Sequence, residues 1–435
     1  MSALLRELRA DGRNVTIAIL ARASMSAARA MAGVAVPLYL ATAGYSPEQL
    51  GLLFAVVAIS SAAISATVGF GSDRLGRRFF MIVVPLLTAA AAAGYAISLS
   101  PVVIFGGAAI GAFGRGGGAG GGNVGPYQPA EQALVTASAA PERRTGIFGR
   151  LAFASSLGAL LGGLVISETG AGHPSAAQAM AAYRPAFVVI ALLAAVAGLL
   201  ALGLLELGAA ERRSKPRLPF FPRRSAWLLY RLWITNSVNG AAMGMMGPFL
   251  TYWFYTRYGV GVHALGLLFA VINAVSMVSN LSAASVARRF GLVRATATLR
   301  MVVAALIVPM VLAPSFLIAG GVYLLRMVAQ RIMAPMRQSY VMGMADPEER
   351  AQVAALSNIP AQATSAVTPA LAGELFEHVS LSAPFLVVAA CQATNAILYY
   401  GFFRGFAPEE ERQASDQPPV EENPRQHTAG HGPKG

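Results

Sequence analysis

The sequence predicts an all-α membrane protein with twelve transmembrane helices in two pseudo-symmetric six-helix bundles. Three observations lead to this fold class. The chain of 435 residues is 55% hydrophobic and only 12% charged, whereas a soluble domain carries about 25% charged residues. Long apolar segments recur along the chain, and each spanning helix needs about 20 such residues. The second half of the chain repeats features of the first.

The first half contains six predicted spans, separated by short polar or basic segments. They lie at residues 15–43, 48–68, 79–99, 101 through the glycine-rich run 114–125, 147–167 and 185–205. Pro126 and Pro129 should kink or end the intramembrane part of the fourth span. Residues 141–144 (PERR) are predicted to form a loop before the fifth span.

The second half contains six further predicted spans, at residues 226–256, 262–287, 295–313, 315–343, 351–376 and 381–404. Between the halves the chain is basic and interrupted by prolines. We therefore expect a cytoplasmic N-terminus over 1–14, an N-terminal bundle over 15–206, a linker over 207–225, a C-terminal bundle over 226–405 and a disordered tail over 406–435.

An internal repeat supports two related halves. Residues 50–56 (LGLLFAV) are identical to residues 265–271, and at the same offset Arg74 aligns with Arg289 and Gly76 with Gly291. Asp73 aligns with Arg288, so the second copy has lost its acid. Residues 141–144 also resemble residues 347–350 (PEER). Two six-span halves related by a parallel repeat form a known transporter architecture.

The charge distribution predicts orientation rather than a nucleic-acid partner. The formal net charge is +13, but the arginines cluster in short loops between apolar runs. In a twelve-span topology these loops fall on one side, with only Arg184 and Arg257 near span ends on the other. This positive-inside pattern places both termini in the cytoplasm and the protein in the cytoplasmic membrane. Cys391 is the only cysteine, which excludes an intrachain disulfide and a cysteine metal cluster.

The segment between the second and third spans, residues 69–78, reads GFGSDRLGRR. It resembles the signature loop of the major facilitator superfamily, Gly-x-Leu-Ala-Asp-Arg-x-Gly-Arg-Lys/Arg. The matching residues are Gly69, Asp73, Arg74, Gly76, Arg77 and Arg78. Gly71 stands where the family usually has leucine.

The resemblance covers residues 15–405 and implies that this loop latches the two halves on the cytoplasmic side. Asp73 would face the start of span 11 when the protein opens outward. Gly69 and Gly76 would allow close backbone approach because they lack a Cβ atom. Arg74, Arg77 and Arg78 would add charge pairs or contact anionic lipid.

Three arginines lie near the middle of predicted spans: Arg29, Arg115 and Arg326. Ionisable residues at this depth are costly and usually functional. The carboxylates, including Glu131, fall near predicted span ends, so the arginines favour a positive cavity and a substrate with a carboxylate or phosphate group. Alternatively, each arginine binds backbone carbonyls of broken helices, and Arg22 extends toward the cytoplasm. Spans 4 and 10 are equivalent in the repeat, which suggests Arg115 and Arg326 as symmetry mates.

Neutral polar residues at similar depth could also bind a solute. They are Asn236, Asn239, Asn273, Gln330 and Gln362. Arg326 and Gln330 share a helix face at spacing i, i+4. The alternative is that these side chains form interhelical hydrogen bonds, which membrane bundles use widely.

The predicted function is secondary transport of a small organic solute by alternating access, with export favoured. Residues 158–163 (GALLGG) partly match the antiporter signature Gly-Pro-x-x-Gly-Gly. A polyspecific drug/proton antiporter for cationic or neutral amphiphiles and a lipid flippase remain alternatives. Protons are a candidate coupling ion, although no titrating intramembrane group is evident, so uniport and anion exchange stay open. We expect a monomer among membrane lipids, with no enzymatic activity, cofactor, metal site or nucleic-acid partner.

Overall fold

The structure is a computed structural model. It describes residues 2–112, 125–138, 141–169, 174–206, 221–279, 289, 291–346, 349, 352–353 and 356–406.

Seven α-helices are described in the N-terminal half. They are α1 (Ser2–Thr42), α2 (Pro47–Leu75), α3 (Arg77–Ile97), α4 (Pro101–Gly111), α5 (Gln128–Ser138), α6 (Pro141–Thr169) and α7 (Ala179–Ala201), with a 3-10 turn η1 (Ala176–Gln178) before α7. The predicted fourth span is thus interrupted between α4 and α5. Ala112 ends α4 in the left-handed conformation, with φ 45°, and α5 begins just after Pro126, with Pro129 in its first turn.

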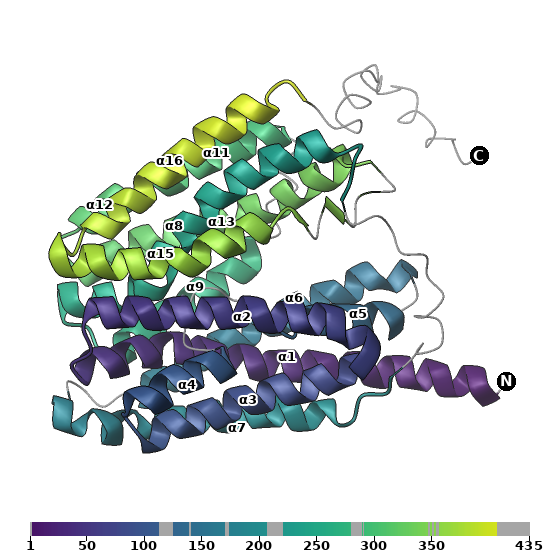
Figure 1. Ribbon diagram of the computed structural model, residues 1–435, viewed down its shortest axis with the longest axis horizontal. Helices are drawn as coiled ribbons and strands as arrows, with labels where there is room; N and C mark the ends of the chain where they lie inside the picture. Colours follow the sequence, from purple (N-terminus) through teal and green to yellow (C-terminus); the bar gives the residue numbers. More distant parts are fainter. Residues whose placement is uncertain are drawn as a thin grey trace, which may run out of the picture.

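The C-terminal half repeats this arrangement. Its described helices are α8 (Ala226–Tyr258), α9 (Val262–Ser279), α11 (Leu292–Ala305), α12 (Ile307–Leu312), α13 (Phe316–Met344), α15 (Ile359–His378) and α16 (Ala383–Phe403). In Figure 1 the helices from α1 to α7 form the lower bundle and those from α8 to α16 the upper one.

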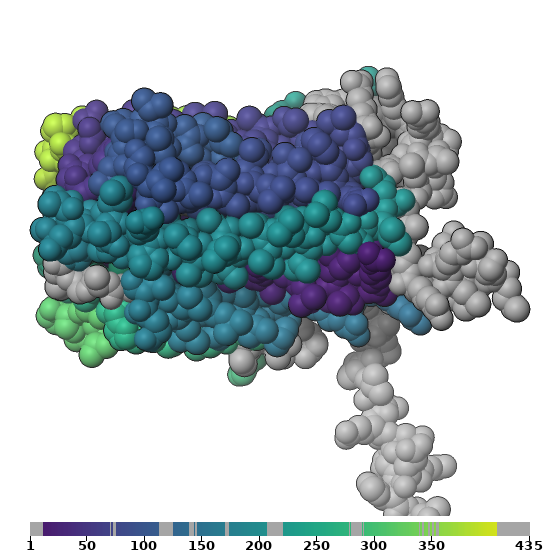
Figure 2. Space-filling view, turned by 90° about the horizontal axis from the view of Figure 1, so that it is seen from below, coloured from purple at the N-terminus to yellow at the C-terminus, as the bar shows by residue number. Residues whose placement is uncertain are grey.

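The predicted fold class is confirmed for the described residues. Eight of their helices are long and apolar enough to cross a membrane, and two shorter apolar helices accompany them, at Pro101–Gly111 and Val262–Met277. The outer face fits a lipid environment. On α7 the apolar side chains of Val188, Leu192, Val196 and Leu199 are exposed along one stripe. Figure 2 shows a face of the N-terminal half covered by such long, parallel helices.

The repeat seen in the sequence is also a repeat of helix geometry. Helices α2, α3 and α4 start at 47, 77 and 101, and α9, α11 and α13 start at 262, 292 and 316, always 215 positions later. Gly76 and Gly291 precede α3 and α11 in the same backbone conformation, with φ of 93° and 74° and ψ of 147° and 152°. Ser100 and Ser315 cap α4 and α13 through their side chains.

Two predicted loops are wrong. The signature segment is almost entirely helical, because α2 continues to Leu75 and α3 starts at Arg77, which leaves only Gly76 between them. The segment starting at Pro141 is the first turn of α6. Arginine is a good helix former, and its long side chain can reach water from a helix end. A cluster of arginines therefore did not mark the ends of these helices.

The two halves contact each other at the end of the molecule away from the termini. There α2 packs on α15, α6 packs on α9, and α1 approaches α8. Toward the end at which α1 begins and α16 ends, the helices of the two bundles diverge (Figure 1).

Candidate transport pathway and gates

The turn of the signature segment is built around Gly76. A Cβ atom there would meet the carboxylate of Glu206, and the positive φ also favours glycine. The Glu206 Oε1 atom accepts the Arg77 backbone N–H at 2.8 Å. The close approach predicted at Gly76 is therefore present, but to a side chain of the same half.

Two signature arginines bind backbone carbonyls of the N-terminal half. Arg77 Nη1 donates to Ala133 O of α5 at 2.6 Å, and Arg78 Nη2 donates to Leu202 O after α7 at 2.6 Å. These bonds join the start of α3 to α5 and to the segment after α7.

The remaining signature residues are Gly69, Asp73 and Arg74. The side chains of Asp73 and Arg74 lie outside the described residues. Among the described residues, a Cβ atom at Gly69 would meet nothing within 4 Å. The close approach expected at Gly69 belongs to a state in which the two halves meet at that end, and it stays a prediction.

The opposite end is closed by helices that cross through glycines. A Cβ atom at Gly51 of α2 would lie 2.5 Å from Pro369 O and 3.1 Å from Gly373 Cα of α15. Its repeat partner Gly266 of α9 faces Gly163 of α6, with Gly163 O 2.6 Å from the added atom. The repeated heptapeptide thus supplies one contact to each side of the closure.

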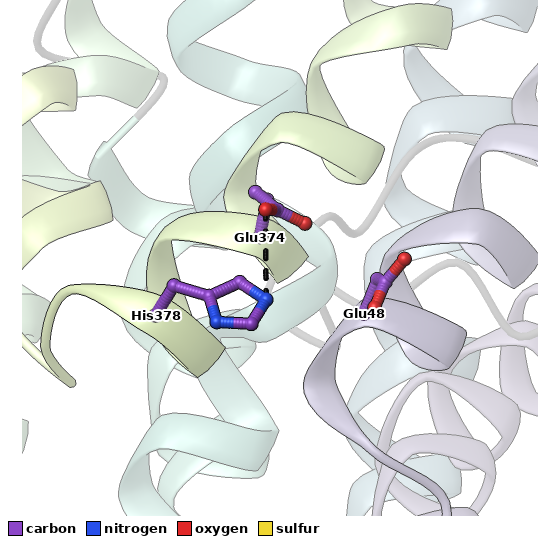
Figure 3. Close-up of side chains that lie close together, drawn as sticks. All are labelled: Glu48, Glu374 and His378. Atoms are coloured by element: carbon purple, nitrogen blue, oxygen red, sulfur yellow. Dashed lines mark ion pairs between the residues drawn. The ribbon is translucent and has the colours of Figure 1, made fainter.

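Charged side chains at the rim of this closure come from both halves (Figure 3). The Glu377 carboxylate on α15 accepts the Glu48 backbone N–H of α2 at 3.1 Å. His378 lies 3.5 Å from Glu374, and the ligand atoms of Glu48, Glu374 and His378 all lie within 4.8 Å of one another. All three are exposed, and exposed acidic groups commonly gather without a metal. The contact that joins the halves here is the bond to Glu377.

A buried ion pair lies between α1 and α5. Arg22 Nε donates to Glu131 Oε1 at 3.0 Å, and Arg22 Nη2 donates to Glu131 Oε2. The side chains are 6% and 0% exposed. The extension of Arg22 to the surface is therefore wrong, and Glu131, in the first turn of α5, is its buried partner. A buried Glu without a partner is costly, so pairing explains why both remain inside.

Arg29 lies seven residues further along α1 and reaches the break in the fourth span. Its Nη1 donates to Ala112 O, the carbonyl at the left-handed end of α4, at 3.2 Å. The guanidinium also occupies the space where a Cβ atom on Gly125 would lie, with Nη1 2.7 Å from it. This is the carbonyl contact considered above as the alternative to a substrate contact.

Arg326 and Gln330 lie one turn apart on α13. Arg326 is 3% exposed, its Nε has no hydrogen-bond partner, and its guanidinium carbon is 5.9 Å from the centre of the Tyr323 ring. Gln330 Nε2 donates to Met243 Sδ of α8 at 3.4 Å. Arg326 is thus a buried cation in an aromatic and apolar setting.

The other predicted polar residues make interhelical or local contacts. Asn236 Nδ2 donates to Ser357 O, and Asn236 Oδ1 accepts from Arg337 Nη1 at 2.7 Å. Asn239 Oδ1 accepts from Gln392 Nε2 at 3.4 Å. Asn273 donates to Phe269 O within its own helix, and Gln362 is exposed.

Arg115 lies outside the described residues. The register of the repeat, however, corrects its expected symmetry mate. With a constant shift of 215 positions, shown by the starts at 101 and 316, Arg115 corresponds to Gln330 and Arg326 to Gly111.

Sequence reasoning missed two arginines inside the C-terminal half. Arg300 on α11 is 2% exposed, and Arg337 on α13 binds Asn236. Both residues fall inside predicted spans, so the criterion that selected Arg326, an ionisable side chain at membrane depth, could also have selected them.

Comparisons with known proteins agree with this architecture. The sequence matches the family described as Major Facilitator Superfamily over residues 18–324 and 232–429. A search of curated protein sequences gives no match.

Several solved structures share the fold. A variant of the nucleoside transporter NupG matches with a TM-score of 0.69 and 13% identity, over 91% of this chain and 100% of that one. The inward-open xylose transporter XylE from E. coli matches with a TM-score of 0.69 and 14% identity, over 92% of this chain and 98% of that one. The human organic anion transporter MFSD10 matches with a TM-score of 0.58 and 18% identity, over 89% of this chain and 99% of that one. This chain belongs to the major facilitator superfamily and is a membrane transporter rather than an enzyme.

Proposed function

We propose that this transporter carries small organic anions across the cytoplasmic membrane by alternating access, and that it exports them. The observation that carries the proposal is Arg326. A buried guanidinium without a partner for its Nε is unfavourable in a low-dielectric site. Among the described residues, no Asp or Glu hydrogen-bonds to it. A carboxylate or phosphate group of a solute would supply the missing charge and acceptor.

Arg29 supports the same proposal from the other half. Gly33, one turn further along α1, accepts a hydrogen bond from Thr251 of α8 at 3.1 Å. Arg29 therefore lies on the side of α1 that faces the C-terminal half. It has only a neutral carbonyl as its hydrogen-bond partner among the described residues. Two arginines, one on each half, would hold an anion between the bundles as they rock.

The proposed orientation follows from the positive loops, which place both termini in the cytoplasm. The closed end built on Gly51 and Gly266 is then the outer one, and the structure represents an inward-facing state. Export is proposed from the partial signature in α6. There Gly158 and Gly162 pack against the backbone of α1 at Ala23 and Ala27, so these glycines link α6 to the helix that carries both Arg22 and Arg29.

Coupling to protons would require a buried group that exchanges a proton. Glu131 is the buried carboxylate that the described part of the chain offers. Protonation would break its pairing with Arg22 and leave Arg22 free to attract an anion. We propose Glu131 as the proton-binding group of an anion/proton carrier.

The experiment is solute-driven stabilisation of the purified protein against organic anions, organic cations and sugars. A ligand that binds the native state raises the unfolding temperature by mass action. We expect anions to stabilise the wild type, and Arg326→Gln and Arg29→Gln to lose most of that effect. Arg257→Gln, at an exposed helix end, is the matched control and should keep it.

Two results would overturn the proposal. Stabilisation by cationic or neutral amphiphiles alone, indifferent to Arg326 and Arg29, would make the arginines structural and favour a polyspecific antiporter. Stabilisation by lipids alone would favour a flippase. Uptake of the best anion into inside-out vesicles then tests export, because an exporter concentrates its substrate there.

A further inference from the structure

A second group of buried polar atoms lies within the C-terminal half, between α11 and α16. Arg300 of α11 is 2% exposed, and its Nε and Nη1 atoms have no hydrogen-bond partner. Its guanidinium carbon lies 5.1 Å from the centre of the Tyr399 ring of α16. This contact covers one face of the guanidinium and leaves its in-plane N–H donors unused.

Further unused polar atoms lie one turn away on the same two helices. Thr296 precedes Arg300 by four residues and lies beside Tyr399. Asn395 precedes Tyr399 by four residues and uses its Nδ2 to donate to Thr235 O at 2.9 Å. The Thr296 and Tyr399 hydroxyls are close enough to interact with each other, and apart from that mutual contact they and Asn395 Oδ1 have no hydrogen-bond partner. Buried polar atoms are normally satisfied, so this cluster is suited to bind a polar ligand.

Arg337 of α13 adds a second positive charge. It is close enough to interact electrostatically with both Arg300 and Tyr399. Its own hydrogen bonds go to Asn236 Oδ1 at 2.7 Å and Asn358 Oδ1 at 3.4 Å, which are neutral acceptors. Within the described residues, neither guanidinium has a carboxylate partner, and a negatively charged ligand would balance their charge.

We propose that Arg300, Thr296, Tyr399 and Arg337 bind a small oxyanion bearing a phosphate or carboxylate group. The two guanidiniums supply the charge, and the hydroxyls of Thr296 and Tyr399 supply further donors. Asn395 Oδ1 suits a hydroxyl of the ligand or a protonated phosphate oxygen. Water could satisfy the neutral atoms but not the charge. This site involves none of the residues of the proposed pathway, so the two proposals can fail separately.

The depth of the site favours a free solute over a lipid headgroup. Arg300 lies eight positions after Leu292, where α11 begins, or about 12 Å along the helix axis at 1.5 Å per residue. Lipid phosphates lie at the membrane surface, outside the hydrocarbon core. Arg337 and the exposed Asn358 lead from the site toward the cytoplasmic end of the C-terminal half.

The test measures thermal unfolding of the detergent-purified full chain with increasing sodium phosphate, at an ionic strength held constant with sodium chloride. We expect a saturable rise in unfolding temperature for the wild type and its loss in Arg300→Met. Because that change removes a buried charge without a carboxylate partner, the variant should unfold at or above the wild-type temperature without phosphate. Arg257→Gln, at an exposed helix end, should keep the phosphate response.

A second variant and a lipid arm complete the test. Tyr399→Phe keeps the ring and removes one donor, and should weaken phosphate binding severalfold in a calorimetric titration. Nanodiscs of phosphatidylglycerol and of phosphatidylcholine distinguish a lipid headgroup from free phosphate as the source of the anion. A response to phosphatidylglycerol alone, dependent on Arg300, would assign the anion to a lipid. The proposal is overturned if neither source stabilises the protein, if Arg300→Met responds like the wild type, or if Arg257→Gln also loses the response.

Discussion

The two glycines of the repeated heptapeptide, Gly51 and Gly266, lie where the two halves meet, and we predict that alanine at either position opens this end. An alanine Cβ at Gly51 would lie 2.5 Å from Pro369 O, and at Gly266 2.6 Å from Gly163 O and 2.9 Å from Ser167 N. These neighbours are backbone atoms, which cannot rotate away as a side chain can. The paired helices of the two halves would have to separate.

The magnitude follows from the cost of overpacking, which is typically about 1–3 kcal/mol per site. Alanine also raises helix stability by about 1 kcal/mol relative to glycine, but this gain is the same in both conformations and cancels. The ratio of inward-facing to outward-facing molecules should therefore fall by roughly 5- to 150-fold for each substitution. Since Gly51 and Gly266 contact different helix pairs, the double variant should be close to additive.

The assay is a distance measurement between spin labels across the outer end. Cys391 is the only cysteine, so labels can be attached at Leu52→Cys and Val379→Cys in a Cys391→Ser background. Both label positions are exposed, at 53% and 65%. We expect Gly51→Ala to shift the population toward longer distances.

Two glycines provide matched controls. A Cβ atom at Gly106 or at its repeat partner Gly321 would meet nothing within 4 Å, so alanine there should leave the distances unchanged. If Gly51→Ala and Gly266→Ala gave the wild-type distance distribution, the closure would not depend on close backbone contact and the reasoning would be refuted.

Three further predictions concern charged groups. Glu131→Gln or Arg22→Met alone should lower the free energy of unfolding by about 3–5 kcal/mol, and replacing both with apolar residues should restore much of this loss. Denaturation measurements test this. Equal losses in the single and double variants would contradict a paired role. Partial desolvation raises the pKa of Glu349, but hydrogen bonds from the Arg224 and Ser225 backbone N–H groups outweigh it and hold the pKa below its usual 4.5. The contribution of Glu349 to the free energy of unfolding should thus be complete above pH 4.5 and be lost as the pH falls through the folded-state pKa. In a Glu349→Gln variant, the free energy of unfolding should depend less on pH in that window. The same pH dependence as in the wild type would count against this role of Glu349. Asp73→Asn should leave the fold intact and strongly lower transport into proteoliposomes, and wild-type transport would exclude a gating role.

The sequence alone determined the class of fold, because the relevant information is local. Apolar length sets the number of spans, and loop charge predicts their orientation. The repeat was also readable, since Leu50 to Val56 recurs unchanged. The structure shows that this repeat predicts three helix starts at one constant offset, and that its Gly51 and Gly266 close the two sides of one interface.

The tertiary structure alone decided which charges are satisfied. Arg22 pairs with Glu131 across 109 positions, and Arg29 binds the carbonyl of Ala112 across 83. Neither contact has a local signature, because both depend on where a broken helix packs against α1. Hydrophobicity fixes that a residue is inside the membrane, but only packing decides what it meets there. For the same reason the buried guanidiniums of Arg300 and Arg326 have different neighbours, the ring of Tyr399 for Arg300 and that of Tyr323 for Arg326.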